Sequence, residues 1–394
     1  MTLPHEAVAS WVSEHEADLI AFRRNLHAHP ELSWREHRTT DALMARLRGF
    51  GLDPTVLHNG TGVVCDIGSG DTTVALRADI DALPLQDLID APYHSLIDGV
   101  CHACGHDVHT AALLGTAGAL AALPPLAGRV RLIFQPAEED LPGGAASVVK
   151  SGALDGVSYT FALHCDPRLQ VGRIGTRVGP ITAAYDKVEV RLTGPGGHTA
   201  RPHLTADLLF ALGKVITEVP AMLSRRVDAR SGMLLVWGAV SAGVAPNTIP
   251  RDGVLRGTVR VLDREVWVDA ESEVRTLVEQ AVAGTGTSVE IDYDRGVPPV
   301  VNDPTAVGVQ REAARVVVGE AGLAATEQSM GGEDFGWYGE HTSAALARLG
   351  VRTPGAEGAV ADLHQGTFDV DERSIAIGAK LMASSALLAF DEGR

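Results

Sequence analysis

The segment Cys101-His102-Ala103-Cys104-Gly105-His106-Asp107-Val108-His109 contains a dense set of soft and borderline metal ligands. Four further groups of the same chemistry stand well apart from it in the sequence: Glu138-Glu139, His164, His198 and His364. A ligand set scattered in this way indicates a metal site built from several loops of one folded domain. A catalytic metal site needs protein ligands, an open coordination position and a nearby base, and the paired glutamates could supply a ligand and the base. The pattern favours a metal-dependent hydrolase.

Length and composition set the outer bounds. A chain of 394 residues exceeds what one hydrophobic core usually holds, so two domains are expected. Hydrophobic residues make up 45% and charged residues 21%, as in an ordinary globular protein. The formal net charge of −17 argues against nucleic acid and anionic membrane surfaces as partners, since both repel an acidic chain.

Targeting and redox signals point to the cytoplasm. The N-terminal region is acidic and has no apolar run, so no signal peptide is expected. The most apolar stretch, Thr110 to Gly128, is interrupted by glycine and proline and is predicted to be a buried helix rather than a membrane span. Four cysteines without an export signal favour a reducing compartment: Cys65, Cys101, Cys104 and Cys165.

Three polar clusters follow apolar segments with strand character. The predicted strand over Thr73–Arg77 leads to Asp79 and Asp81, the strand over Val130–Phe134 leads to Glu138-Glu139, and the strand over Tyr159–Leu163 is followed directly by His164. Open α/β sheets place their sites beyond the carboxyl ends of such strands. We therefore expect an α/β catalytic domain with an open mixed sheet.

A second pattern begins near Gly179. Strands and helices follow in the order β-α-β-β-α-β, the plan of a ferredoxin-like domain. The predicted elements are strands near Val188–Leu192, Met233–Ala239, Val254–Val261 and Val289–Tyr293, with helices over Leu204–Leu223 and Glu265–Ala283. The predicted organisation is a discontinuous catalytic domain, residues 1–180 and 296–394, interrupted by an inserted domain, residues 181–295.

Several cluster residues have competing interpretations. Cys101 and Cys104 have the spacing of a structural zinc half-site or a redox motif, but the sequence has neither a second cysteine pair nor a thioredoxin context. Asp107 is expected to cap the helix that follows it. Asp79 and Asp81 are expected either to hydrogen-bond metal ligands and orient them or to be turn residues.

The two glutamates are a sharper indication. Neighbours in sequence point in different directions, so one carboxylate can bind metal while the other acts as a base. With His164 and His364 the sequence offers five candidate ligands, enough for two metal ions that share a bridging ligand.

At these residues the chain resembles the metal-dependent amidohydrolases of the aminoacylase, hippurate hydrolase and indoleacetyl-amino-acid hydrolase type, relatives of the two-metal aminopeptidases and carboxypeptidases. The matching segments occur in order over nearly the whole chain: residues 24–32, 77–84, 102–107, 135–139, 196–198, 245–250, 331–335 and 363–364. The resemblance implies that Cys104, His106, Glu139, His164 and His364 are metal ligands with Cys104 as the bridge, and that Glu138 is the general base. It also implies an inserted lid domain that pairs with its twin in a homodimer, or in a tetramer built from such pairs.

The expected reaction is hydrolysis of the amide bond of N-acyl amino acids, with an acetyl, benzoyl, indoleacetyl or other acyl group. His198 is expected to hold the oxyanion, and in the resembling family dimer pairing brings this histidine into the partner's site. Asn247 and Arg260 are candidates for binding the substrate carboxylate. The two expected divalent ions are manganese or zinc, with cobalt or nickel as alternatives. The competing functions are a dipeptidase or carboxypeptidase, and a non-catalytic metal-binding protein on the same fold.

Three positions depart from the family pattern. Asp140 follows Glu139 where such enzymes usually continue into glycines, Cys165 follows His164, and Cys101 stands where an apolar residue is expected. These departures remove no ligand, but they add a carboxylate and two thiols close to the predicted metals.

Overall fold

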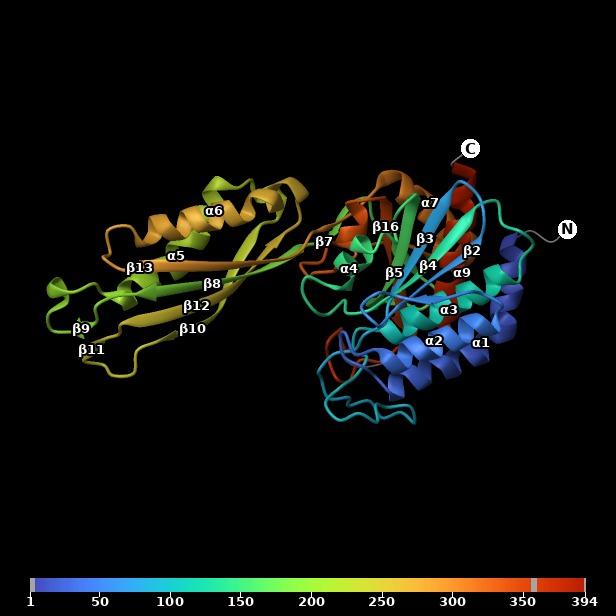
Figure 1. Ribbon diagram of the computed structural model, residues 1–394, viewed down its shortest axis with the longest axis horizontal. Coiled ribbons are helices and arrows are strands. Elements are labelled where there is room, and N and C mark those ends of the chain that lie inside the picture. Colours follow the sequence, from blue (N-terminus) through green and yellow to red (C-terminus); the bar gives the residue numbers. More distant parts are fainter. Residues whose placement is uncertain (1–3, 356–359, 393–394) are drawn as a thin grey trace. The chain divides into compact units, whose positions relative to one another are not determined.

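The computed structural model describes residues 4–355 and 360–392. The chain divides into two compact units, the first made of Met1–Gly179, Val301–Glu327 and Asp334–Arg394, the second of Pro180–Val300 and Gln328–Glu333. The sequence-derived insertion, residues 181–295, falls within the second unit, which also takes in the short segment Gln328–Glu333. Both units are drawn in Figure 1.

The first unit contains a mixed sheet of eight strands. Its strand order is β1-β2-β4-β3-β5-β16-β6-β15. The central strands β4, β3, β5 and β16 run parallel to one another. The pairs β1–β2, β2–β4 and β6–β16 are antiparallel. The bounds are β1 Thr55–Val56, β2 Val63–Gly68, β3 Thr73–Asp79, β4 Arg129–Gln135, β5 Val157–Gln170, β6 Ile174–Thr176, β15 Leu323–Ala325 and β16 Ser343–Arg352.

Helices cover this sheet. The bounds are α1 Pro4–Ala28, α2 His37–Gly49, α3 His106–Ala121, α4 Gly144–Lys150, α7 Pro304–Gly322, α8 Gly336–Gly339 and α9 Arg373–Glu392. Helices α1, α3 and α9 pack on one another, and α3 and α9 also contact the central strands. Since α3 is apolar on all sides, it is buried along nearly its whole length. The prediction of a buried helix here is confirmed, although the helix ends at Ala121 rather than near Gly128.

Helix α9 is long and apolar enough to span a membrane by length and composition, the one such helix in residues 4–355 and 360–392. However, 72% of its most apolar window, within Arg373–Asp391, is buried in the fold. A core helix of a globular domain has this combination of properties.

The second unit has the predicted ferredoxin-like plan. Its antiparallel sheet has the order β10-β12-β8-β13, with helices α5 and α6 packed together on it. Residues of β8 alternate between buried and accessible positions, as expected for a strand with one covered face. The bounds are β8 Ala184–Thr193, α5 Leu208–Arg226, β10 Leu234–Ala242, β12 Asp252–Val261, α6 Arg264–Val282 and β13 Ser288–Val297.

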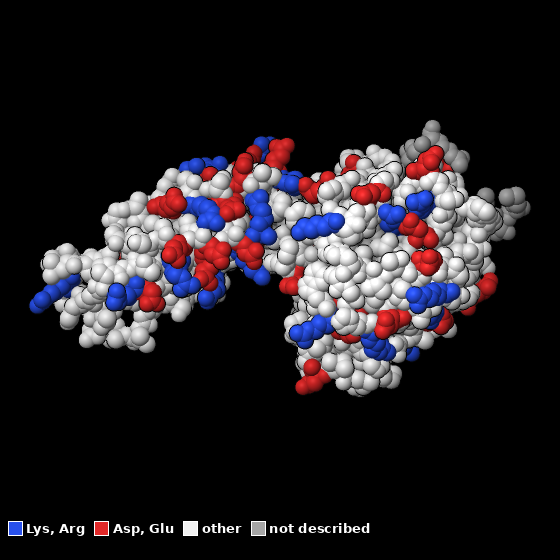
Figure 2. All heavy atoms as spheres, viewed as in Figure 1, with Lys and Arg blue, Asp and Glu red and all other residues white. Residues whose placement is uncertain are grey.

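Shorter elements complete the chain. Strands β9 Gly197–His198 and β11 Thr248–Ile249 form a two-stranded sheet within the second unit. Strands β7 Gly179–Thr182 and β14 Val300–Asn302 lie where the chain passes from one unit to the other, and η1 Pro202–Leu204 and η2 Ala229–Ser231 are single 3₁₀ turns. On the face drawn in Figure 2, Asp and Glu side chains are interspersed with Lys and Arg side chains.

Candidate metal centre

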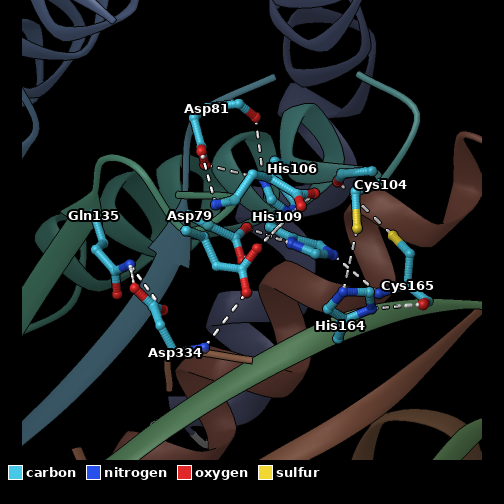
Figure 3. A network of polar contacts seen from close by, with 12 residues as sticks. Asp79, Asp81, Cys104, His106, His109, Gln135, His164, Cys165 and Asp334 are labelled. Atoms are coloured by element: carbon cyan, nitrogen blue, oxygen red, sulfur yellow. Dashed lines mark hydrogen bonds and ion pairs between the residues drawn. The ribbon is translucent and has the colours of Figure 1, made fainter. Parts of the chain in front are cut away.

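Three of the predicted ligands, Cys104, His106 and His164, lie close together, with Asp79 and Asp81 beside them (Figure 3). Asp79 is the last residue of β3, and Glu138-Glu139 follow β4 after a short connection. One local expectation was wrong. His164 does not follow the end of a strand, because β5 continues to Gln170 through pairing with β16.

His106 is oriented by its Nδ1 atom. This atom lies 3.0 Å from the Asp81 carbonyl oxygen and 3.3 Å from Asp81 Oδ1. Since both are acceptors, Nδ1 carries a proton, which leaves Nε2 as the ring nitrogen that can bind a metal. Nε2 has no hydrogen-bond partner in the described part of the chain and lies 3.9 Å from both Glu138 Oε2 and Glu139 Oε1. Metal-binding histidines show this arrangement, with one ring nitrogen held by a carboxylate or carbonyl.

The charge around His106 favours a cation. Burial opposes protonation of its imidazole, but Asp79 and Asp81 outweigh burial and raise the pKa of His106 to about 10. Asp79 itself is fully buried, and although burial opposes its ionisation, His106 and Arg77 hold the pKa of its carboxyl well below the ordinary value. The site therefore concentrates negative charge where a divalent cation would neutralise it.

His164 is prepared in the same way as His106. Its Nδ1 lies 2.8 Å from the Cys165 carbonyl oxygen, so Nε2 presents a lone pair, 3.6 Å from Cys104 Sγ. Burial lowers the pKa of His164 well below its usual value, and Arg348 adds to this effect. A neutral imidazole beside a buried thiol is a suitable pair of ligands for a borderline metal.

The donor atoms form two groups that share Cys104. One group is Cys104, His106 and His164, the other is Cys104, Glu139 and His364, and within each group the donor atoms lie within 4.8 Å of one another. His364 Nε2 lies 3.3 Å from Glu139 Oε1, and the backbone N–H of His364 donates to Ala103 O at 2.8 Å. The structure thus brings all five sequence-predicted ligands together, in two groups of donor atoms that have Cys104 in common.

Glu138 and Glu139 differ in their contacts, as expected for neighbours with different roles. Glu139 Oε1 faces His364, and its backbone N–H donates to Asp81 Oδ2 at 3.0 Å. Glu138 Oε1 instead lies 3.4 Å from the backbone nitrogen of Asp334, and its other oxygen faces His106.

Asp79, predicted to orient a ligand, reaches His106 less directly than Asp81 does. Asp79 Oδ1 lies 2.6 Å from His109 Nδ1, and Asp79 Oδ2 lies 3.7 Å from His106 Nε2. His109 Nε2 accepts the backbone N–H of Cys165 at 2.9 Å, so both nitrogens of His109 are used within the protein. Because both of its nitrogens are engaged, His109 is a positioning residue, although a ring nitrogen of His109 lies within 4.8 Å of donor atoms of Asp79 and His106.

Asp107 was expected to cap α3, and this expectation was wrong. Helix α3 begins at His106 with Gly105 at its N-cap, and Asp107 lies inside the first turn, where its Oδ1 accepts the backbone N–H of Val108 at 3.0 Å while its Oδ2 faces α1. Asp107 Oδ2 lies 2.6 Å from Arg23 Nε and 2.8 Å from His27 Nδ1. A residue more than eighty positions away determines this contact, so no local pattern could have revealed it.

A buried ionic network supports the site from the other side. Arg77, which is 1% exposed, donates to Asp79 Oδ2 at 2.6 Å and to Asp334 Oδ1 at 2.7 Å. Gln135 Nε2 also donates to Asp334 Oδ2, at 2.7 Å (Figure 3). Tyr338 Oη in turn donates to Gln135 Oε1. Arg77 and Asp334 lie in segments that the family resemblance singled out, but their pairing depends on the fold.

The comparisons with known proteins agree with this geometry. The sequence model of Peptidase family M20/M25/M40 matches residues 75–387. The chain belongs to this family. As a member it is a hydrolase, as the sequence predicted, and the predicted fold class of a catalytic α/β domain with an insertion is confirmed.

Relatives of this family member cover its whole described fold. A solved dinuclear metal-binding peptidase of family M20 from Bacillus subtilis is 33% identical, with a TM-score of 0.83 over 96% of this chain and 99% of that one. The N-acetyl-L-cysteine deacetylase of Bacillus subtilis strain 168 is 37% identical over 98% of this chain and 91% of its own length.

A protein of Rhodococcus jostii strain RHA1, provisionally named glutamate–cysteine ligase 2-3, is 48% identical over 98% of this chain. The M20 chain spans 48% of the length of that protein.

The three remaining predicted residues of this M20 protein lie in the second unit. His198 is exposed on β9 and pairs with Thr248 of β11, directly after Asn247. Arg260 lies at the other end of β12, where its guanidinium group stacks 3.9 Å above the Tyr185 ring and donates to Met330 O at 3.0 Å. The structure therefore brings His198 and Asn247 together but separates Arg260 from them.

The departures from the family pattern have defined surroundings. The Asp140 carboxylate accepts the indole N–H of Trp34 at 2.9 Å. The Cys165 thiol packs against Gly105, where an added Cβ would lie 2.8 Å from Sγ. Cys101 is buried beside Leu83, and burial raises the pKa of its thiol to about 11. None of the three displaces a predicted ligand.

Proposed function

We propose that this M20 hydrolase cleaves the amide bond of N-acyl amino acids. Family membership supports the reaction class, and the relative named N-acetyl-L-cysteine deacetylase supports a small acyl amino acid as substrate. The acyl group belongs to the acetyl, benzoyl and indoleacetyl class, and the leaving group is an amino acid with a free carboxylate.

Cys104, His106, Glu139, His164 and His364 would hold two divalent ions, with Cys104 shared. The unpartnered Nε2 of His106, the Nε2 of His164 directed at Cys104 and the surplus of buried carboxylates fit such ions. When bound, these ions supply Lewis acidity that polarises the amide carbonyl and lowers the pKa of the attacking water. The mixture of thiolate, imidazole and carboxylate suits manganese or zinc, with cobalt or nickel as alternatives.

Glu138 is the proposed general base. One observation carries this assignment: the two adjacent carboxylates both approach His106 but differ in their other contacts, Glu139 facing His364 and Glu138 lying 3.4 Å from the Asp334 backbone nitrogen. In this role Glu138 accepts a proton from the attacking water and then delivers it to the leaving nitrogen. An intact base also argues against a purely metal-binding function.

Arg260 and Asn247 are proposed to bind the substrate carboxylate, and His198 to stabilise the oxyanion. Their placement supports a dimeric site. Arg260 and the β9–β11 sheet lie at opposite ends of β12, separated by roughly 26 Å at the usual rise of a strand. Groups so far apart in one sheet do not reach the same small substrate, so we infer that Arg260 serves one site and that His198, with the adjacent Asn247, serves the site of a second copy in a homodimer or a tetramer of such pairs.

The net charge of −17 supports a small-molecule partner, with neither nucleic acid nor membrane involved, and we propose a cytoplasmic location.

The experiment that tests this function uses purified protein reconstituted separately with manganese, zinc, cobalt and nickel. Each form is assayed for amine release from N-acetyl, N-benzoyl and indoleacetyl amino acids, with unblocked dipeptides as the competing class. We expect faster hydrolysis of the N-acyl amino acids. Faster cleavage of the dipeptides would assign the protein as a dipeptidase, and release from neither class with any metal would overturn the proposed reaction.

A further inference from the structure

Glu36 is a buried carboxyl group that takes no direct part in the proposed chemistry. It occupies the N-cap position of α2, where an acidic side chain normally accepts a backbone N–H from its own helix, but it makes no such bond. Glu31 performs this task instead, accepting Arg38 N at 2.9 Å and Thr39 N at 2.8 Å. The Glu36 carboxylate is therefore available for another purpose.

One oxygen of Glu36 binds two unusual backbone positions. Oε1 accepts the N–H of Trp34 at 3.0 Å and the N–H of Ala137 at 2.8 Å. Trp34 has a φ of 65° and Ala137 a φ of 54°, left-handed conformations that residues with a Cβ atom rarely adopt. Only three non-glycine residues in the described ranges have a positive φ, and Glu36 contacts two of them.

Ala137 directly precedes Glu138, so its conformation sets the direction in which Glu138 leaves the backbone. Ala137 is fully buried, and its carbonyl oxygen accepts the N–H of Gly144 at 2.8 Å. The next residues are also held from outside: Glu139 N by Asp81 Oδ2, and the Asp140 carboxylate by the indole of Trp34. Glu36 thus fixes Ala137, at the start of the loop that carries Glu138 (residues 137–140). It also fixes Trp34, whose indole holds Asp140 at the end of that loop.

We propose that Glu36 is a positioning residue for the general base, acting through the backbone of Ala137 and Trp34 to aim the Glu138 carboxylate at the metal centre. This inference rests on the proposed function of Glu138. Holding an ionised carboxylate at this position costs free energy, because burial and the nearby Asp81 raise the pKa of the Glu36 carboxyl to about 7. A carboxyl group retained in such surroundings has a role that an apolar residue could not fill.

The proposal differs from a purely structural role in what it predicts for turnover. A helix-stabilising residue affects the melting temperature, whereas a residue that aims the base affects kcat, since a displacement of about 1 Å in a reacting group costs on the order of 100-fold. Glu31 provides a matched control, because it is a nearby glutamate whose side chain also accepts two backbone N–H groups but holds only the first turn of α2.

The test compares Glu36→Ala, Glu36→Gln and Glu31→Ala in the metal-loaded full chain. Glu36→Ala should lower kcat about 100-fold, with KM and metal content within about twofold of the wild type. Glu36→Gln should keep most of the activity, because its amide oxygen can still accept the N–H of Ala137. Glu31→Ala should lower the melting temperature and leave kcat nearly unchanged.

A second measurement does not depend on activity. Amide hydrogen exchange over residues 135–145 should lose protection in Glu36→Ala but not in Glu31→Ala. The proposal is overturned if this segment stays protected in Glu36→Ala, if Glu36→Ala and Glu31→Ala lose equal turnover, or if Glu36→Gln falls as far as Glu36→Ala. If Glu138→Gln retains full activity, the base assignment fails instead, and the exchange result still decides whether Glu36 holds the loop.

Discussion

Replacing Glu36 with glutamine should make the protein more stable, and increasingly so as the pH rises. The Glu36 carboxyl is buried, and its pKa is raised from 4.5 to about 7, first by burial and then by the charge of Asp81. Between these two values the folded state retains a proton that the unfolded state has released. Stability therefore falls as the pH rises through this window, and the loss is complete above the folded pKa.

The magnitude follows from the size of the shift. A displacement of about 2.5 pKa units corresponds to roughly 3 kcal/mol, of which about three quarters develops between pH 5 and pH 8. Glutamine does not titrate, so the stability difference between Glu36→Gln and the wild type should grow by about 2 to 3 kcal/mol over that range. For a domain of this size such a difference raises the melting temperature by several degrees.

The assay is chemical and thermal unfolding of both proteins at pH 5, 6, 7 and 8, followed by circular dichroism and tryptophan fluorescence. All other carboxyl groups are common to the two proteins, so their titrations cancel in the difference. A stability difference that stays constant across the range would refute the reasoning, because it would mean that Glu36 ionises in the folded protein as easily as in the unfolded chain.

Three other outcomes are expected. Glu138→Gln should lower turnover by about 10²- to 10⁴-fold with full metal content, whereas Glu139→Gln should lower metal occupancy, and equal metal loss in the two variants would contradict the assignment of the pair. Chelation should abolish activity while preserving the circular dichroism spectrum. It should also expose Cys104 to alkylation, with buried Cys65 as the unreactive control. Labelling of Cys104 at the same rate with and without metal would argue against its being a ligand. His198→Ala and Glu138→Ala should each be inactive, and mixing them should restore part of the activity in hybrid dimers; no recovery after verified subunit exchange would place His198 outside the partner's site.

Periodicity in the sequence was enough to predict the fold of the inserted unit. Val188, Val190 and Leu192 alternate with exposed neighbours on β8, and helices α5 and α6 show the apolar spacing of surface helices, so each element could be recognised from its own residues. The proximity of the candidate ligands could also be anticipated, because the family resemblance pointed to Cys104, His106, Glu139, His164 and His364, and the structure places their donor atoms in two neighbouring groups.

Contacts between distant segments could not be predicted in this way. The end of β5 was missed because the strand continues past its apolar run through backbone hydrogen bonds to β16, which do not depend on side-chain type. The separation of Arg260 from His198 was missed because membership in one small domain gives no information about which end of a strand a residue occupies.

The backbone conformations that aim the functional groups were equally hidden. Trp34, Ala137 and His364 are the three non-glycine residues with positive φ in the described parts of the chain, and all three belong to the site or to the segment that holds it. None is a glycine or asparagine, so composition gave no sign of a left-handed turn. Such conformations persist only where the surroundings fix them. Here the fixing contacts are the Glu36 carboxylate for Trp34 and Ala137, and the Ala103 carbonyl for His364. The ligand motifs determine which atoms take part in the chemistry, and these strained positions, held from remote parts of the sequence, determine where those atoms point.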